Sequence, residues 1–244
     1  MALAPEPQSL SQIRVVLSHP SHPGNIGATA RAMKTMGLTR MWLVQPKLFP
    51  DPQAVAMAAG AEDVLASARV CASLDDALVG TIAATALTSR RRDLATQPAW
   101  ARQAAAQIVQ EASLGEVAIV FGNETAGLSN AEVSLCRHWA VIPTSSAYKS
   151  LNLAQAVQIL CYEIRLAAIE PGAPPKVTEM GMPASHEEIE ALIRHLERAA
   201  IGSKFLDPEQ PKRLILRMRR MFSRAGLEQE EINILRGMLS SFEK

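Results

Sequence analysis

Three short segments of this chain place small and polar residues directly after an apolar run. They cover residues 22–31 (HPGNIGATAR), 121–128 (FGNETAGL) and 142–157 (IPTSSAYKSLNLAQAV). In an open α/β sheet, ligands bind in the loops that follow the carboxyl ends of the strands. The three segments together therefore predict one composite binding site.

The first segment has the residue pattern of a tight turn followed by a helix, and it also contains a charged residue that this pattern does not require. Its glycines allow a tight turn, and Asn25 can cap the helix that follows. This structural interpretation leaves out Arg31, which lies one turn further along on an otherwise small and apolar stretch. A guanidinium at that place could face a phosphate or a ribose.

The second and third segments contain a carboxylate and a hydroxyl that could take part in chemistry. Gly122 and Gly127 frame Glu124, but their spacing is neither that of a dinucleotide-binding loop nor that of a P-loop. We expect Glu124 to be a solvated loop carboxylate rather than a catalytic base. In the third segment, we expect the Ser150 hydroxyl to cap the helix that follows.

Arginines form two local clusters in a chain whose charge is nearly balanced, with 25 basic and 24 acidic side chains. Three of them follow the apolar run that ends at residue 87, where a solvated loop and a contact with an RNA backbone are equally good explanations. In the tail, spacings of 4, 3 and 4 put another set on one helix face, namely Arg213, Arg217, Arg220 and Arg224. A face of one charge sign favours a phosphate-backbone partner.

Other residue types exclude several classes of protein. The five histidines lack the spacing of a metal site, so we expect no metal, and no Ser-His-Asp arrangement is present. The three cysteines are far apart, as in a reducing compartment. The sequence has neither a signal peptide nor the run of about 18 apolar residues that a membrane helix needs, so we expect a cytoplasmic protein without membrane contact. Because no nucleophile is apparent, the reactive group is expected to arrive on a cofactor.

Alternating apolar runs and helical patterns predict how these residues are positioned. Buried strands are expected over residues 13–17, 41–44, 81–87, 116–121 and 139–142, and helices over residues 28–36, 100–112 and 151–169. Strands that alternate with helices predict an α/β fold with a mostly parallel sheet covered on both faces. The last of these helices is apolar around most of its circumference, which predicts that it is buried.

The composition changes after residue 169. We predict a first domain over residues 1–169, a Pro/Gly-rich linker over 170–184 and a small all-helical extension over 185–244. Three helices, expected over residues 185–200, 208–223 and 227–242, are marginal as an independent fold. We therefore expect the extension to lean on the first domain or on a second subunit.

In this order and at this spacing, the three segments resemble the motifs of the SPOUT methyltransferases, whose SpoU branch methylates ribose 2′-hydroxyls of RNA. The matching residues are Asn25, Gly27 and Arg31 for the N-x-G-x-x-x-R pattern, Gly122, Glu124 and Gly127 for G-x-E-x-x-G, and Pro143 with residues 150–154 (SLNLA) for the third and most specific motif. The match covers about residues 12–168.

Two further runs, residues 30–38 (ARAMKTMGL) and 232–237 (INILRG), are similar to those of a bacterial subgroup that methylates cytidine or uridine at nucleotide 32 of the tRNA anticodon loop. This similarity implies tRNA as the partner. A ribosomal RNA substrate and a non-catalytic RNA-binding protein of the same fold are the alternatives. The second would be expected to lack Arg31 or the Ser150 loop, and both are present.

The resemblance also implies a deep trefoil knot, S-adenosyl-L-methionine held by its loops, and a homodimer that packs its knotted helices together. The residues that it implies for catalysis are Asn25, Arg31 and Ser150. Those implied for cofactor binding are Thr88, Ser89, Arg90, Gly122, Ile142, Ser150, Leu151 and Asn152. The candidates for RNA binding are Arg91, Arg92, Arg213, Arg217, Arg220 and Arg224.

Overall fold

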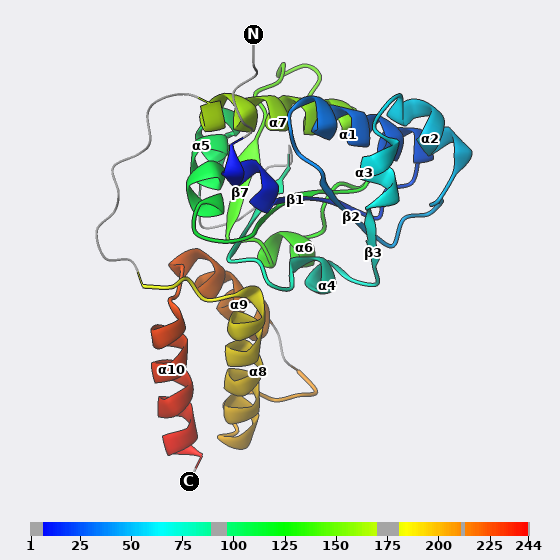
Figure 1. Cartoon of the computed structure of the whole chain (residues 1–244). Coiled ribbons are helices and arrows are strands. Elements are labelled where there is room, and N and C mark those ends of the chain that lie inside the picture. Colours follow the sequence, from blue (N-terminus) through cyan, green and yellow to red (C-terminus); the bar gives the residue numbers. More distant parts are fainter. Residues whose placement is uncertain (1–6, 89–96, 170–180, 211–212, 244) are drawn as a thin grey trace.

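A seven-stranded sheet forms the centre of the first domain (Figure 1). The structure is a computed structural model that describes residues 7–88, 97–169, 181–210 and 213–243. Its strands pair in parallel in the order β3-β2-β1-β6-β4-β7-β5. The strands are β1 Ile13–Ser18, β2 Arg40–Val44, β3 Arg69–Cys71, β4 Ala83–Leu87, β5 Ala99–Trp100, β6 Val117–Phe121 and β7 His138–Val141.

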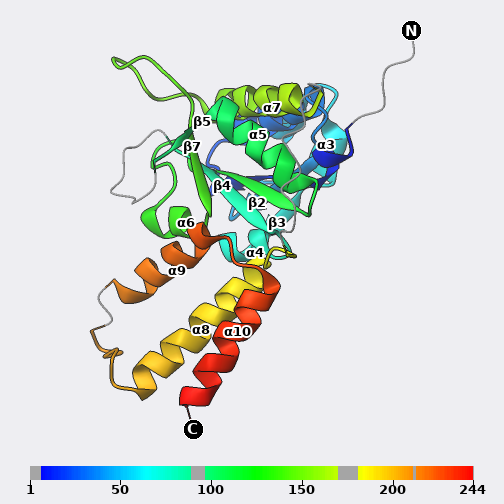
Figure 2. The same cartoon turned by 90° about the vertical axis from the view of Figure 1, so that its left-hand side faces the viewer.

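Helices cover both faces of this sheet, as the alternation of patterns predicts (Figure 2). The first-domain helices are the 3-10 helix Gln8–Gln12, α1 Pro23–Thr35, α2 Pro52–Ala58, α3 Glu62–Ala66, α4 Leu74–Leu78, α5 Ala101–Ala112, α6 Asn130–Ser134 and α7 Leu153–Ile169. On one face, α1, α5 and α7 pack against side chains such as Val15 and Ile119. On the other face, α4 and α6 pack against Val16 and Val120. Because successive strand residues point to opposite faces, both neighbours are buried in the central strands β1 and β6.

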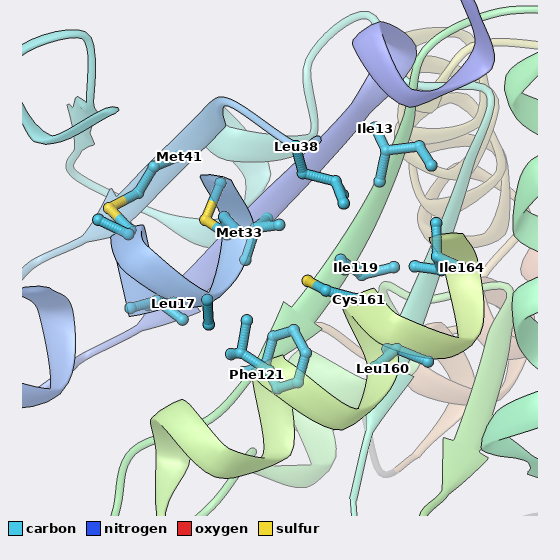
Figure 3. Close-up of a cluster of buried hydrophobic side chains, with 14 of the residues drawn as sticks. Ile13, Leu17, Met33, Leu38, Met41, Ile119, Phe121, Leu160, Cys161 and Ile164 are labelled. Atoms are coloured by element: carbon cyan, nitrogen blue, oxygen red, sulfur yellow. The ribbon is translucent and has the colours of Figure 1, made fainter. Parts of the chain in front are cut away.

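The long helix α7 is buried along one face only. Leu160 and Ile164 lie in the apolar cluster with Phe121 between the sheet and the helices (Figure 3). On the outer side, Tyr162 is 49% exposed and Ile169 is 52% exposed. The prediction of a helix buried all round is therefore wrong for the outer face in the single chain.

The five strands and three first-domain helices expected from the sequence are present, with their ends shifted by a few residues. The helix expected to start at residue 28 begins at Pro23, because proline is well tolerated in the first turn of a helix. The elements not expected from the sequence are β3, β5, α2, α3, α4 and α6. The longest of them, α2, has seven residues, so none is long enough to show a clear periodicity.

Gly27 is required by helix packing rather than by the tight turn predicted for it. The residue lies inside α1, and a Cβ at this position would overlap the backbone carbonyl of Ala54 in α2. Gly27 thus allows α1 and α2 to approach more closely than a side chain would permit.

The extension contains three helices, α8 His186–Gly202, α9 Leu214–Ala225 and α10 Gln229–Phe242 (Figure 1). They share a small apolar core that includes Leu192, Phe222 and Ile232. Residues 181–184, predicted as part of the linker, pack with this extension. Ala184 is buried, and its N–H donates to the Leu227 carbonyl at 2.8 Å.

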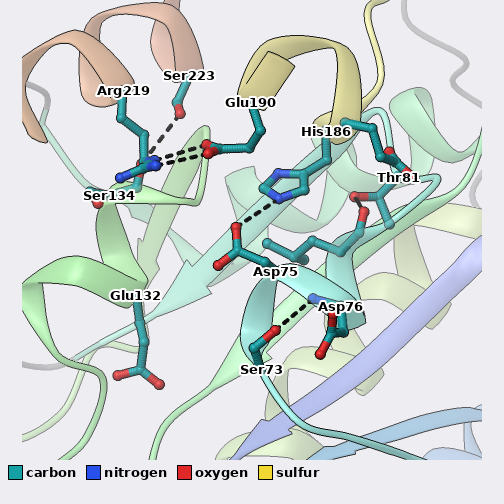
Figure 4. Close-up of polar contacts among 12 residues, drawn as sticks. Ser73, Asp75, Asp76, Thr81, Glu132, Ser134, His186, Glu190, Arg219 and Ser223 are labelled. Atoms are coloured by element: carbon teal, nitrogen blue, oxygen red, sulfur yellow. Dashed lines mark hydrogen bonds and ion pairs between the residues drawn. The ribbon is translucent and has the colours of Figure 1, made fainter. Parts of the chain in front are cut away.

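The extension leans on the first domain through polar contacts (Figure 4). His186 Nε2 lies 3.2 Å from Asp75 Oδ1 in α4, and the His186 N–H donates to the Thr81 carbonyl at 2.9 Å. Ser223 Oγ of α9 donates to the Ser134 carbonyl of α6 at 3.3 Å. The first domain of the same chain therefore provides the support expected for the extension.

None of the helices in the described part of the chain has the length and apolar character needed to span a membrane. All three cysteines are free thiols. Cys136 and Cys161 are buried, and burial raises the pKa of the Cys161 thiol to about 12. Such thiols remain protonated and unreactive.

Candidate functional site

A pocket opens at the carboxyl ends of β4, β6 and β7, beside the point between β1 and β6 where the strand order changes direction. Open parallel sheets bind ligands at such a point. The residues that line it are Leu87, Thr88, Phe121, Gly122, Asn123, Glu124, Thr125, Gly127, Leu128, Ile142, Thr144, Lys149, Ser150, Leu151, Leu153 and Ala156. The second and third sequence segments thus form much of one pocket, as predicted, whereas no residue of the first segment lines it.

The loop after β6 folds back on itself and needs both of its glycines. A Cβ on Gly122 would overlap the backbone nitrogen of Leu128. Gly127 has a φ of 66°, in the left-handed region, and its N–H donates to the Asn123 carbonyl at 2.8 Å. The two glycines therefore produce a tight loop whose backbone faces the pocket.

Glu124 in this loop is held as an ionised acceptor by Ser21 and by two residues of the first segment. Its Oε2 accepts hydrogen bonds from the Ser21 N–H (2.9 Å) and the Ser21 hydroxyl (2.7 Å), and its Oε1 accepts from Asn25 Nδ2 (2.9 Å) and the His22 N–H (3.2 Å). Partial burial raises the pKa of Glu124, but the hydrogen bonds from Asn25 and Ser21 outweigh it and lower the pKa to about 2. The expectation of a solvated carboxylate is wrong. A carboxylate with this pKa is also a weak base.

Two asparagines extend this network to the third segment. Asn25 Oδ1 accepts a hydrogen bond from Asn152 Nδ2 at 2.9 Å. Asn152 Oδ1 accepts the N–H of Ala154, in the first turn of α7, at 2.9 Å. Glu124, Asn25 and Asn152 therefore connect the three sequence motifs through their side chains.

The same contacts correct two predictions about helix caps. Asn25 lies within the first turn of α1, whose N-cap is His22, and its side chain is directed to the second motif. Asn152 rather than Ser150 caps α7. Ser150 is exposed at the pocket, so its hydroxyl is available to a ligand.

Most residues implied for cofactor binding line the pocket. Those found there are Thr88, Gly122, Ile142, Ser150 and Leu151. Asn152 does not belong to the lining but ties this wall to Asn25. Four further candidates, which follow β4 in the sequence, lie outside the described residues. They are Ser89 and Arg90 for cofactor binding and Arg91 and Arg92 for RNA binding.

Arg31 lies on α1 and does not belong to the pocket wall. Its side chain is exposed and forms no hydrogen bond or ion pair with any residue in the described ranges. Arg31 follows Asn25 by six positions, which is about 9 Å along the helix axis. Because helical side chains tilt towards the N-terminus, Arg31 extends towards the end of α1 that meets the pocket.

The arginines of the tail divide between solvent and protein. Arg213, Arg217 and Arg224 are exposed, whereas Arg220 is half-buried. Burial and the neighbouring charge of Arg224 lower the pKa of Arg220. The exposed members of the predicted face are therefore available to a phosphate backbone.

Another arginine of α9 has a structural partner. Arg219 donates two hydrogen bonds of 2.8 Å to the Glu190 carboxylate of α8 (Figure 4). Asp75, His186 and Glu190 bring possible metal-ligand atoms within 4.8 Å of one another. Because the Arg219 guanidinium already supplies the positive charge there, we assign this group to docking of the extension.

Ser21 and Lys149 are site residues that the sequence does not single out. Ser21 binds a carboxylate 103 positions away, and no spacing rule indicates such a contact. Lys149 lines the pocket, and the available signal was its position beside Ser150 in the third segment.

Two family models match this chain. Residues 12–162 match the SpoU rRNA Methylase family, and residues 187–244 match the C-terminal domain of tRNA methyltransferase TrmJ. The tRNA (cytidine/uridine-2′-O-)-methyltransferase TrmJ of Klebsiella pneumoniae is 42% identical over 238 residues, which cover 96% of this chain and 98% of that protein.

Solved structures agree with these matches. TrmJ from Z. mobilis ZM4 is 35% identical with a TM-score of 0.82, and the alignment covers 95% of this chain and 99% of that chain. The SpoU methyltransferase AviRb from Streptomyces viridochromogenes, solved in complex with the cofactor AdoMet, shares the fold at 24% identity and a TM-score of 0.52, over 64% of this chain and 58% of that chain.

Proposed function

The chain belongs to the SpoU methylase family and ends in a TrmJ-type C-terminal domain, and from this premise we propose that it transfers a methyl group from S-adenosylmethionine to a ribose 2′-hydroxyl of cytidine or uridine in tRNA. The observation that supports the proposal is that side-chain hydrogen bonds of Glu124, Asn25 and Asn152 join three motifs, two of which line one pocket. We extend it to nucleotide 32 of the anticodon loop as the target and, because the substrate is tRNA, to action in the cytoplasm.

The pocket fits S-adenosylmethionine. Its wall includes residues of the tight loop after β6, which Gly122 makes possible because a Cβ there would overlap the Leu128 nitrogen. Leu87, Ile142 and Leu151 offer an apolar surface for an adenine ring. The bound cofactor supplies a methyl carbon on a sulfonium leaving group, so the chain needs no nucleophile of its own.

The residues of the chain have to hold the 2′-hydroxyl and help it to lose a proton. The exposed Ser150 hydroxyl can orient it through a hydrogen bond. We assign Arg31 an electrostatic contact with the ribose oxygen or the adjacent phosphate, because a guanidinium keeps its proton in proteins and cannot act as a base. Asn25 and Asn152 act as positioning residues for the loops around the reacting atoms.

We also propose a homodimer in which α7 packs against its counterpart. The outer side of this helix leaves Tyr162 and Ile169 half-exposed in the single chain. Covering apolar surface stabilises an interface by about 25 cal/mol per Å², and a two-fold axis would cover the same face of both copies. Light scattering of the purified chain tests this proposal, and a monomer at micromolar concentration would contradict it.

The first test of the activity is methyl transfer from radiolabelled S-adenosylmethionine to bulk tRNA and, separately, to ribosomal RNA, followed by nucleoside analysis. We expect the label in tRNA as 2′-O-methylcytidine or 2′-O-methyluridine. Label confined to ribosomal RNA would keep the fold and the chemistry but replace the substrate. No transfer to either RNA, with cofactor binding intact, would favour a non-catalytic RNA-binding protein.

A further inference from the structure

The segment between β7 and α7 presents one large aromatic side chain to solvent. It extends outward from the body of the first domain (Figure 2). Within residues 144–150 all other side chains are small or polar, yet Tyr148 is 77% exposed. The Tyr148 hydroxyl forms no hydrogen bond with any residue that the structure describes.

Local hydrogen bonds give this segment a defined turn. The Tyr148 N–H donates to the Ser145 carbonyl at 3.3 Å, and the Ala147 N–H donates to the Ser145 hydroxyl at 3.2 Å. The turn lies directly before Lys149 and Ser150, which both line the pocket. Since neighbouring Cα atoms are about 3.8 Å apart, the ring is attached at the pocket mouth.

We propose that Tyr148 is a specificity-determining residue whose ring stacks on the base of the nucleotide that receives the methyl group. This inference rests on the proposed function. The reaction requires a ribose 2′-hydroxyl at the pocket, and the base of that nucleotide is attached to the neighbouring ribose carbon. An unpaired base in an RNA loop can be turned out and stacked on an aromatic ring.

The position of Lys149 supports this assignment. Lys149 follows Tyr148 in sequence, lines the pocket and has no ion-pair partner among the described residues. A phosphate next to the target ribose would meet this charge while the base meets the ring. Two adjacent side chains would thus hold the base and the backbone of one nucleotide, with the Ser150 hydroxyl next in sequence at the ribose.

The test is steady-state kinetics of the full chain with tRNA, using Tyr148→Ala, Tyr148→Leu and Tyr148→Phe. Stacking on one base is worth about 1–3 kcal/mol, which corresponds to about a 5- to 160-fold effect. We expect KM for tRNA to rise by that factor in the alanine and leucine variants, with a smaller change in kcat, because the contact is made before the reaction. Tyr148→Phe should stay within about twofold of wild type. Val70→Ala, which shortens a 57% exposed side chain in β3 at the other edge of the sheet, is the control and should leave KM unchanged.

A second substrate tests the stacking partner directly. The nucleotide that the wild-type chain methylates is replaced in the tRNA by a ribose without a base. Wild type and Tyr148→Ala should then have the same KM, because the ring has lost its partner. A difference that persists on this substrate would overturn the proposal.

Other outcomes would also overturn it. An unchanged KM in Tyr148→Ala excludes a role for the ring, and a Phe variant as impaired as the Ala variant assigns the effect to the hydroxyl. A parallel loss of S-adenosylmethionine affinity, measured by calorimetry, or a changed oligomeric mass would make the ring a structural contact. If the wild-type chain methylates no RNA, the proposed function fails first and this inference falls with it.

Discussion

At the scale of single residues, the site depends on a carboxylate that is fixed rather than reactive. Glu124 lies between the first and second motifs and accepts four hydrogen bonds. Because these bonds favour the ionised form, the carboxylate contributes to stability only while it is charged. Glu124 is therefore a structural anchor for Asn25 rather than a catalytic acid or base.

Glu124→Gln should therefore destabilise the fold at neutral pH by about 2 kcal/mol, since bonds to a charged acceptor are replaced by weaker ones and an amide NH₂ faces donors. The folded-state pKa of about 2 lies below the ordinary value of 4.5. The contribution of the charge is thus fully present above pH 4.5 and is lost as the pH falls towards 2. Urea unfolding of both proteins at pH 7 and at pH 3 measures this loss.

The difference in unfolding free energy between wild type and Glu124→Gln should be smaller at pH 3 than at pH 7. Glu209→Gln, a change at an exposed carboxylate of the extension, is the matched control and should show a difference near zero at both pH values. An equal difference at pH 3 and pH 7 would contradict a charge-dependent anchor.

Arg31 offers the opposite case, because its side chain has no hydrogen bond or ion pair with any residue in the described part of the chain. Its side chain is exposed, so Arg31→Ala should change the unfolding free energy by less than about 0.5 kcal/mol. Methyl transfer should fall by about 100-fold if the guanidinium stabilises charge near the reacting oxygen. If Arg31→Lys retains turnover, the reaction needs only a positive charge at this position. If Arg31→Lys loses turnover, the reaction needs the two parallel hydrogen bonds that a guanidinium can donate. An undiminished rate in Arg31→Ala would remove Arg31 from the mechanism.

At the scale of elements, helix α7 begins where the third motif meets the other two. Asn152 caps the helix and also donates to Asn25, whereas the Ser150 hydroxyl at the pocket has no hydrogen bond with any residue that the structure describes. Asn152→Ala should lower the unfolding free energy by about 1 kcal/mol, as loss of a helix cap does. Ser150→Ala should leave stability within about 0.5 kcal/mol of wild type but reduce methyl transfer.

Thermal and urea unfolding of these two variants show whether each side chain stabilises the fold as a helix cap. Turnover measured on the same variants shows whether each side chain contacts the substrate. If Ser150→Ala were the less stable of the two, the hydroxyl would have a capping role that the structure does not assign to it.

The strands and long helices could be predicted from the sequence because hydrophobic periodicity is a local property. The convergence of the three loops was also predictable, since parallel strands carry their carboxyl-end loops to one edge. The links between the loops could not be predicted. A bond between Asn25 and Asn152 joins residues 127 positions apart, and either amide could equally cap its own helix. Gly27 shows the same limit, because its partner Ala54 belongs to a helix too short to be recognised.

At the scale of the whole molecule, the extension is held against the sheet domain by a mixed set of contacts. Arg219 pairs with Glu190 inside the extension, and His186 meets Asp75 across the boundary. One arginine of helix α9 therefore stabilises packing within the extension, whereas other arginines of this helix are exposed to solvent. Docking of α9 on α6 also brings this charged helix next to the segment that follows the second motif.

The exposed arginines of α9 should give tRNA binding its salt dependence. Each phosphate contact releases about one counterion, so Arg217→Gln should weaken tRNA binding and reduce the slope of log affinity against log salt by about one unit. Arg194→Gln, the same change on an exposed arginine of α8, should leave the slope unchanged. Binding titrations at several salt concentrations measure both slopes. An equal slope for wild type and Arg217→Gln would assign the tail helices to support of the fold, because a helix that touches phosphates cannot lose a cation without changing the number of ions released.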